Sequence, residues 1–248
     1  MALKVVSARE RPDLVRRADS LDVGFHEYNL HGDVLEPLWP LLFERFPGCQ
    51  LALFEDSDET VLGAGNTIPC AWSGTVEGLP AGIDAVLERG FAGDGESPNT
   101  LSALLIKIAP GHAGQGLSRL LLGAMRELAG RLGFADLIAP VRPNWKDRYP
   151  LTPIEEYARW TRQDGLPFDP WMRVHSRLGA DLLAVAPESL RISGPVDEWE
   201  RWIGLPLPAS GLYVIPGGLA PLRVDREADL GLYFEPNVWM RHGALAPS

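Results

Sequence analysis

The sequence has little of what marks several common classes of protein. Among its 248 residues there are two cysteines, Cys49 and Cys70, which are too few for a disulfide framework or a zinc site. The five histidines show no metal-ligand spacing, so no metal is expected. No apolar run reaches the roughly 18 residues of a membrane span, and the first residues do not resemble a signal peptide. These absences predict a cytoplasmic protein with no membrane partner.

The 33 acidic residues outnumber the 23 basic ones. The formal net charge is −10, and a nucleic-acid partner is therefore not expected, because such partners require a basic footprint. An acidic surface can attract a cationic amine, or it can simply keep the protein in solution. The sequence also lacks a Gly-x-Ser-x-Gly elbow, which disfavours a serine hydrolase.

The pattern of apolar residues predicts alternating helices and strands. Strands are expected at residues 4–7, 50–55, 60–68, 101–108, 137–141 and 181–186. Helices are expected at residues 12–25, 34–46, 83–88, 117–132, 154–162, 169–178 and 195–203. Pro236 indicates that any strand across residues 233–239 is broken or lies at a sheet edge.

One segment predicts a phosphate-binding site. A buried strand at residues 101–108 precedes the glycine-rich loop Gly111-His112-Ala113-Gly114-Gln115-Gly116 and an amphipathic helix that ends at Gly133. A helix N-terminus offers free N–H groups and partial positive charge to an anion, and glycines let the backbone approach it. The loop has no Gly-Lys-Ser/Thr, and its glycine order is the reverse of a dinucleotide fingerprint.

This loop resembles the (Q/R)-x-x-G-x-(G/A) signature of the GNAT acyltransferase superfamily, with Gly111 in place of the usual Gln or Arg. Asn144 after strand 137–141, and the later run 173–180 with its Leu178-Gly179, resemble further parts of that family. The resemblance implies an α/β fold with a mixed, mostly antiparallel central sheet flanked by helices. It covers residues 1–186, with insertions near 73–99 and 143–170, and residues 187–248 are expected to complete the same domain.

The resemblance also implies acetyl-CoA or another acyl-CoA as co-substrate. In the family, strand N–H groups bind the pantetheine arm and polarise the thioester, and the loop holds the pyrophosphate. Asn144 would face the arm or the sulfur. The coenzyme-binding residues implied in this way are Ile106, Lys107, Ile108, Gly111, His112, Ala113, Gly114, Gln115, Gly116, Leu117, Ser118 and Asn144.

Proton transfer needs further side chains. His175 matches the position where the family often has a tyrosine as general acid, although a structural histidine fits equally well. Tyr149 and Tyr157 are alternative donors. The candidate bases are Glu77, Glu96 and Glu235, each of which can also be an ordinary solvated carboxylate. We therefore predict His175, Tyr149 and Glu235 as the catalytic residues.

The expected function is that of an acyl-CoA-dependent N-acyltransferase, most simply an N-acetyltransferase, acting on a small-molecule amine. Residues 144–150, 168–173 and 233–239, which mix aromatic and charged side chains, are expected to form the substrate walls or to anchor loops. A homodimer is possible. Two alternatives stay open at this point: an acyl-CoA sensor without turnover, and a nucleotide or dinucleotide enzyme that uses the same loop.

Overall fold

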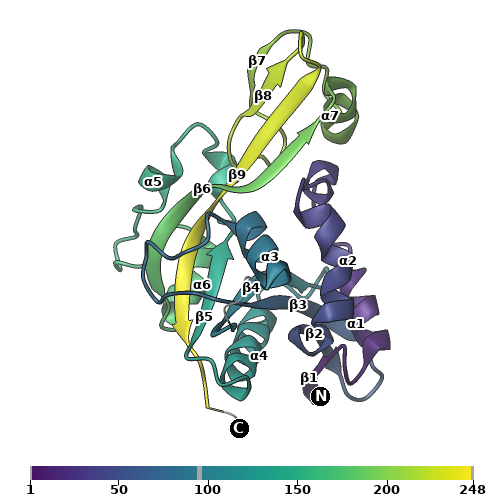
Figure 1. The fold of residues 1–248 in the computed structure, drawn as a ribbon, viewed down its shortest axis with the longest axis vertical. Helices are drawn as coiled ribbons and strands as arrows, with labels where there is room; N and C mark the ends of the chain where they lie inside the picture. Colours follow the sequence, from purple (N-terminus) through teal and green to yellow (C-terminus); the bar gives the residue numbers. More distant parts are fainter. Residues whose placement is uncertain (1, 94–96, 247–248) are drawn as a thin grey trace.

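The computed structural model describes residues 2–93 and 97–246, and within these ranges the strands form one nine-stranded sheet (Figure 1). Its order is β1-β2-β3-β4-β5-β9-β8-β7, and β6 pairs with β9. The strands are β1 (Leu3–Ser7), β2 (Gln50–Glu55), β3 (Val61–Cys70), β4 (Thr100–Ile108), β5 (Asp136–Val141), β6 (Asp181–Gly194), β7 (Gly211–Tyr213), β8 (Leu222–Asp225) and β9 (Leu230–Gly243). The β4–β5 pair is parallel and the other pairs are antiparallel, so the expected mixed, mostly antiparallel sheet is confirmed.

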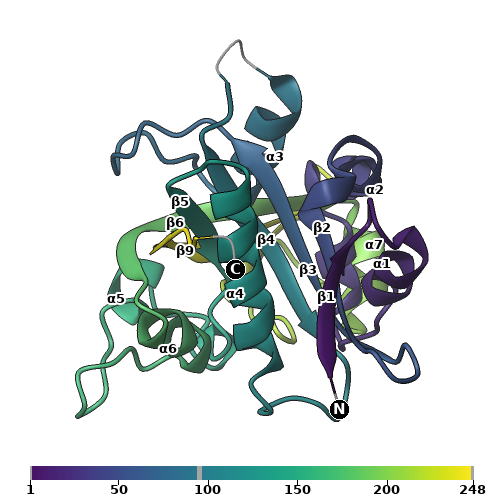
Figure 2. The same ribbon diagram turned by 90° about the horizontal axis from the view of Figure 1, so that it is seen from below.

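Helices cover both faces of the sheet (Figure 2). Helices α4 and α6 pack on one face, and α1, α2 and α3 pack on the other. The α-helices are α1 (Pro12–Asp19), α2 (Leu35–Arg45), α3 (Ile83–Ala92), α4 (Leu117–Arg131), α5 (Ile154–Tyr157), α6 (Pro170–Arg177) and α7 (Val196–Ile203). Short 3₁₀ turns are η1 (Glu27–Leu30), η2 (Pro47–Cys49) and η3 (Lys146–Arg148).

Helix α4 packs closely on the sheet because β3 carries glycines beneath it. A Cβ atom added to Gly65 would lie 2.8 Å from Met125 Cε, and one added to Gly63 would lie 3.0 Å from Leu121 Cδ1. Leu121 and Met125 are fully buried. A larger residue at either glycine would force the helix away from the sheet, since packed interiors hold few voids. The amphipathic period expected at residues 117–132 is confirmed, and the predicted cap at Gly133 has a φ of 78°.

Strands β4 and β5 separate along their length, and this opens the sheet. Only two residue pairs join them, Leu101 with Leu137 and Ser102 with Ile138. A register shift against β3 places Leu104 as an extra residue in β4. Such a bulge bends its strand and increases the local twist. Within the described ranges, the edge of β4 that faces β5 therefore has no strand partner beyond Ser102.

Strand β9 corrects the expectation drawn from Pro236. The strand runs unbroken from Leu230 to Gly243 and lies inside the sheet, between β5 and β6. Pro236, which has no N–H to donate, is accommodated because neither β5 nor β6 pairs with β9 at this residue. On one side β6 skips from Ala186 to Leu190 at this level, and on the other side β5 begins to pair only at Val238.

A second correction concerns the helix expected at residues 154–162. Helix α5 is a single turn that ends at Tyr157. The chain then turns back, with an isolated bridge between Thr161 and Pro167 and a backbone hydrogen bond from Phe168 to Trp160. This turn brings Trp160 and Phe168 together with ring centroids 5.7 Å apart, so aromatic packing overrides helix propensity here.

Candidate functional site

The glycine loop between β4 and α4 has the backbone geometry of an anion site. Gly111, Gly114 and Gly116 all have φ between 79° and 84°, the left-handed region that favours glycine. Helix α4 has no acidic residue in its first turn and no side-chain cap. Among the described residues, none accepts a hydrogen bond from the backbone N–H groups of residues 113–118. These donors and the helix dipole are therefore available to phosphate oxygens.

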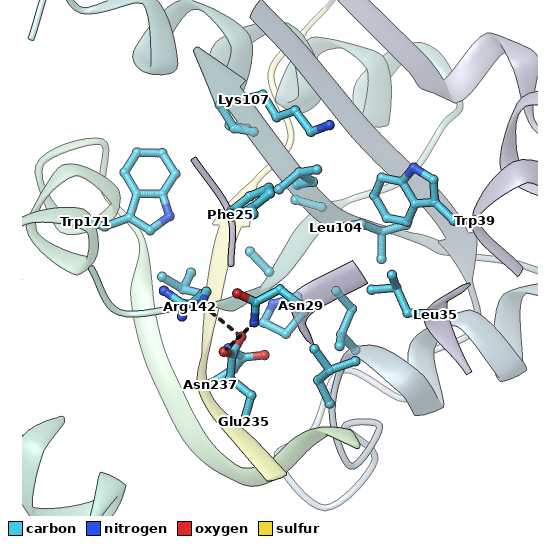
Figure 3. Close-up of a pocket in the computed structure, with 18 of the residues that line it drawn as sticks. Phe25, Asn29, Leu35, Trp39, Leu104, Lys107, Arg142, Trp171, Glu235 and Asn237 are labelled. Carbon is cyan, nitrogen blue, oxygen red and sulfur yellow. Dashed lines mark hydrogen bonds and ion pairs between the residues drawn. The ribbon is translucent and has the colours of Figure 1, made fainter. Parts of the chain in front are cut away.

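A cavity of about 400 Å³ lies where β4 and β5 separate. Its walls come from residues 103–107 of β4 and 139–142 at the end of β5, together with side chains from η1, α2, α6 and β9. Figure 3 shows two regions: Asn29, Arg142, Glu235 and Asn237 gather at one end, and Leu35, Trp39 and Leu104 lie together beside them. The cavity thus joins a polar end to an apolar wall, as small-molecule sites commonly do.

The cavity is lined from both faces of the sheet. Leu122 of α4, with Trp171 and His175 of α6, belongs to the face that carries the glycine loop helix. The opposite face contributes Leu35 and Trp39 of α2, and Ile83 of α3. The gap between β4 and β5 therefore connects two separate surfaces, and two substrates can meet in it from opposite sides.

Glu235 is the buried carboxylate of the cavity, with 4% of its surface exposed. Its Oε1 accepts a hydrogen bond of 2.9 Å from Nε of Arg142. Its Oε2 accepts longer bonds, 3.3 Å from the hydroxyl of Tyr233 and 3.4 Å from Nδ2 of Asn29. One oxygen is thus held by an ionic bond that fixes the carboxylate, and the other makes only longer bonds to two neutral donors.

His175 lines the other side of the cavity and forms a pair with a second buried histidine. Its Nδ1 lies 2.9 Å from Nε2 of His242 on β9, and its Nε2 has no hydrogen-bond partner among the described residues. Burial and the neighbouring His242 lower the pKa of His175 to about 3. The imidazole is therefore neutral near pH 7. When His242 donates to Nδ1, the N–H of His175 sits on Nε2, where it can donate a hydrogen bond.

The histidine pair predicts an acid-sensitive fold. Burial lowers the pKa of both rings, to about 3 for His175 and about 4 for His242, from 6.5. Because the folded state resists protonation, their contribution to stability is complete above about pH 6.5 and is lost as the pH falls toward 4. Each histidine should contribute about 1.4 kcal/mol per pH unit in that window. The free energy of unfolding of His242→Gln, measured with urea at several pH values between 7 and 4.5, should depend less steeply on pH than that of the wild type. The difference should be about 1.4 kcal/mol per pH unit. The same pH dependence of the free energy of unfolding in variant and wild type would contradict the lowered pKa of His242.

The structure places the residues predicted from the sequence in different settings. Ile106, Lys107, Asn144, His175 and Glu235 line the cavity. Ile108 and the segment from Gly111 to Ser118 continue from it along β4 and its loop, outside the lining.

Three predicted proton-transfer residues are not brought to the cavity. Tyr149 is 36% exposed and packs its ring edge-on to Trp160, with centroids 4.9 Å apart, and Tyr157 is buried with its hydroxyl bonded to Asp169. Neither lines the cavity, so the geometry gives no support to Tyr149 as a catalytic residue. Glu77 is exposed elsewhere, and Glu96 lies outside the described residues.

Arg142 and Asn29 were missed from the sequence, whereas Asn237 lies in the stretch 233–239 that was expected to form a substrate wall. Arg142 directly follows the strand expected at residues 137–141, and a charged residue at a strand end was a usable signal. Asn29 gave no signal in the sequence, because its contact with Glu235 joins residues 206 positions apart.

The described residues offer neither a membrane-spanning helix nor a metal-binding cluster. None of the helices in the described part of the chain is both long and apolar enough to cross a membrane. Within the same residues, histidine, cysteine and acidic side chains form no cluster of three or more that could hold a metal ion.

Comparison with known proteins adds a relative and a shared fold. No protein-family model matches the chain. The arginine N-acetyltransferase avaD of Aspergillus versicolor is 34% identical over 239 residues, covering 84% of this chain and 81% of the relative. The loading GNATL domain of CurA from Lyngbya majuscula superposes with a TM-score of 0.61 at 17% identity, over 98% of both chains. The GNAT-like decarboxylase GphF, in complex with isobutyryl-CoA, gives 0.57 at 14% identity over 98% of this chain and 99% of that one. The two solved structures share the fold.

Proposed function

The chain belongs to the GNAT superfamily of acyl-CoA-dependent N-acyltransferases, and we propose that it transfers the acetyl group of acetyl-CoA to a primary amine of a small molecule. It is an acyltransferase that acts on an amine. The observation that carries the proposal is the cavity at the gap between β4 and β5, which is lined from both faces of the sheet and holds the buried Glu235. The name of the relative makes arginine the first acceptor to test.

The coenzyme is expected to bind on the face of α4. Its pyrophosphate would take hydrogen bonds from the free N–H groups of residues 113–118, and its pantetheine arm would follow the unpaired edge of β4 into the gap. N–H groups on that edge, near the bulge at Leu104, would polarise the thioester carbonyl. Each such donor is worth about 3–4 kcal/mol of transition-state stabilisation.

Glu235 would act as the base in the reaction that follows. The acceptor ammonium gives one proton to Glu235, and the freed amine nitrogen attacks the thioester carbon. The N–C bond forms, the C–S bond breaks, and the second proton lost from nitrogen ends on the departing sulfur. His175 lies on the coenzyme side of the gap, where its neutral N–H can stabilise the thiolate.

Coenzyme binding is tested by thermal melting. Coenzyme A or acetyl-CoA at about 100 times its dissociation constant stabilises the fold by roughly 2.7 kcal/mol, which raises the Tm by about 5–10 °C for a chain of this size. NAD and ATP should give no rise. A rise with NAD or ATP alone would contradict the assignment of the loop.

Turnover is tested by thiol release from acetyl-CoA with a panel of small amines that includes arginine. Release of coenzyme A that depends on the amine supports the proposal. Coenzyme binding without transfer to any amine would instead identify an acyl-CoA sensor. A cytoplasmic location and a homodimer stay predictions.

A further inference from the structure

The acceptor side of the cavity carries a built ionic site. Along β5 the side chains alternate, so that Ile138 packs toward α3 and Ala139 toward α4. Arg142 falls on the same face as Ile138. On β9, Trp239 packs on that face as well, and alternation places Glu235 and Asn237 with it. The polar end of the cavity therefore lies on the face opposite α4, away from the anion-binding loop.

Within the described part of the chain, the guanidinium of Arg142 is held in this site by two hydrogen bonds, which leave one of its nitrogens free. Its Nε donates to Glu235 at 2.9 Å and its Nη2 donates to the carbonyl of Gly217 at 3.1 Å. No acceptor for Nη1 lies among the described residues. Burial lowers the pKa of Arg142, but the Glu235 carboxylate more than reverses this, so the guanidinium stays charged. The N–H groups of Nη1 are therefore free to donate charge-assisted hydrogen bonds to a carboxylate.

The charges that line the cavity cancel. Arg142 and Lys107 are balanced by Glu235 and Glu36, although the whole chain has a formal charge of −10. A site for a polyamine would be expected to present excess negative charge, because a desolvated cation needs a counter-charge. A balanced pair of one guanidinium and one carboxylate instead suits a molecule that carries both an ammonium and a carboxylate.

We propose that the acceptor is an amino acid whose carboxylate binds the guanidinium of Arg142 while its ammonium faces Glu235. This inference rests on the proposed function and narrows it from amines in general to carboxylate-bearing amines. A carboxylate on the acyl group of the donor, as in malonyl-CoA, has the same chemistry. The position of Arg142 on the face opposite α4 favours the acceptor as its source.

The test compares L-arginine with agmatine, which keeps the guanidinium and a primary amine but lacks the carboxylate. In the wild type, kcat/KM for L-arginine should exceed that for agmatine by at least about 10²-fold, because agmatine offers no acceptor to the free Nη1 donors and a site built to hydrogen-bond a substrate group rejects the analogue that lacks it. Arg142→Lys keeps the charge but cannot hold Glu235 and Gly217 and also present the Nη1 donors, so the ratio should fall at least about tenfold. Arg201→Lys, at an exposed pair on α7, is the matched control and should leave the ratio unchanged.

The outcomes separate the two proposals. Equal use of agmatine and L-arginine by the wild type, or an unchanged ratio in Arg142→Lys, would overturn the inference while leaving amine acetylation intact. Use of malonyl-CoA that disappears in Arg142→Lys would assign the guanidinium to the donor and overturn it as well. A coenzyme-induced rise in Tm in Arg142→Lys shows that the variant is folded. Absence of transfer to every amine by the wild type would instead count against the proposed function.

Discussion

Glu235→Gln is expected to lower kcat/KM for acetyl transfer by about 10²–10⁴-fold, the usual contribution of a positioned general base. The carboxylates that line the cavity in the described part of the chain are Glu36 and Glu235. Glu36 is exposed at the rim and accepts a bond from His31, whereas Glu235 is buried. Glutamine has nearly the same shape but cannot take the proton from an ammonium.

The measurement is the rate of thiol release at saturating acetyl-CoA, together with the coenzyme-induced rise in Tm. The variant should bind coenzyme normally, because Glu235 lies on the face opposite the loop. It should lose some thermal stability, because Arg142 is left without its ionic partner. Glu227→Gln, at an exposed turn, is the matched control. Turnover within a few-fold of wild type in Glu235→Gln would remove this residue from the mechanism.

The second large effect is expected at the loop. Gly114→Asp should raise the Michaelis constant for acetyl-CoA by about 30–100-fold, since a carboxylate set beside the pyrophosphate replaces favourable helix-terminus electrostatics with repulsion of about 2–3 kcal/mol. The backbone tolerates the change, because Asp and Asn are enriched among non-glycine residues with positive φ. Gly114 has a φ of 79°, and an added Cβ meets nothing within 4 Å.

Gly114→Asn provides the matched comparison. It has the same size and the same backbone strain as the aspartate but no charge, so its Michaelis constant should stay within a few-fold of wild type. The aspartate effect should also shrink as ionic strength rises, because the loop is exposed and salt screens the repulsion. Equal effects of Asp and Asn would show that the loop acts through its shape alone, and no effect of either would place the pyrophosphate elsewhere.

The sequence alone determined the strand, loop and helix at residues 100–131. Local rules govern each part: a continuous apolar run gives a buried strand, glycines allow positive φ, and a 3.6-residue period gives a one-sided helix. These parts carry the resemblance to the family, and the relative and the shared fold agree with it. The coenzyme side of the site was therefore accessible from short stretches of chain.

The acceptor side was decided by the tertiary structure. Arg142 meets Glu235 across 93 residues, and His175 meets His242 across 67, because β9 enters the sheet between β5 and β6. Strand backbones all offer the same donors and acceptors, so local sequence does not specify which strands become neighbours. Burial of the whole core decides that order, and it also carried Tyr149 into an aromatic cluster away from the cavity.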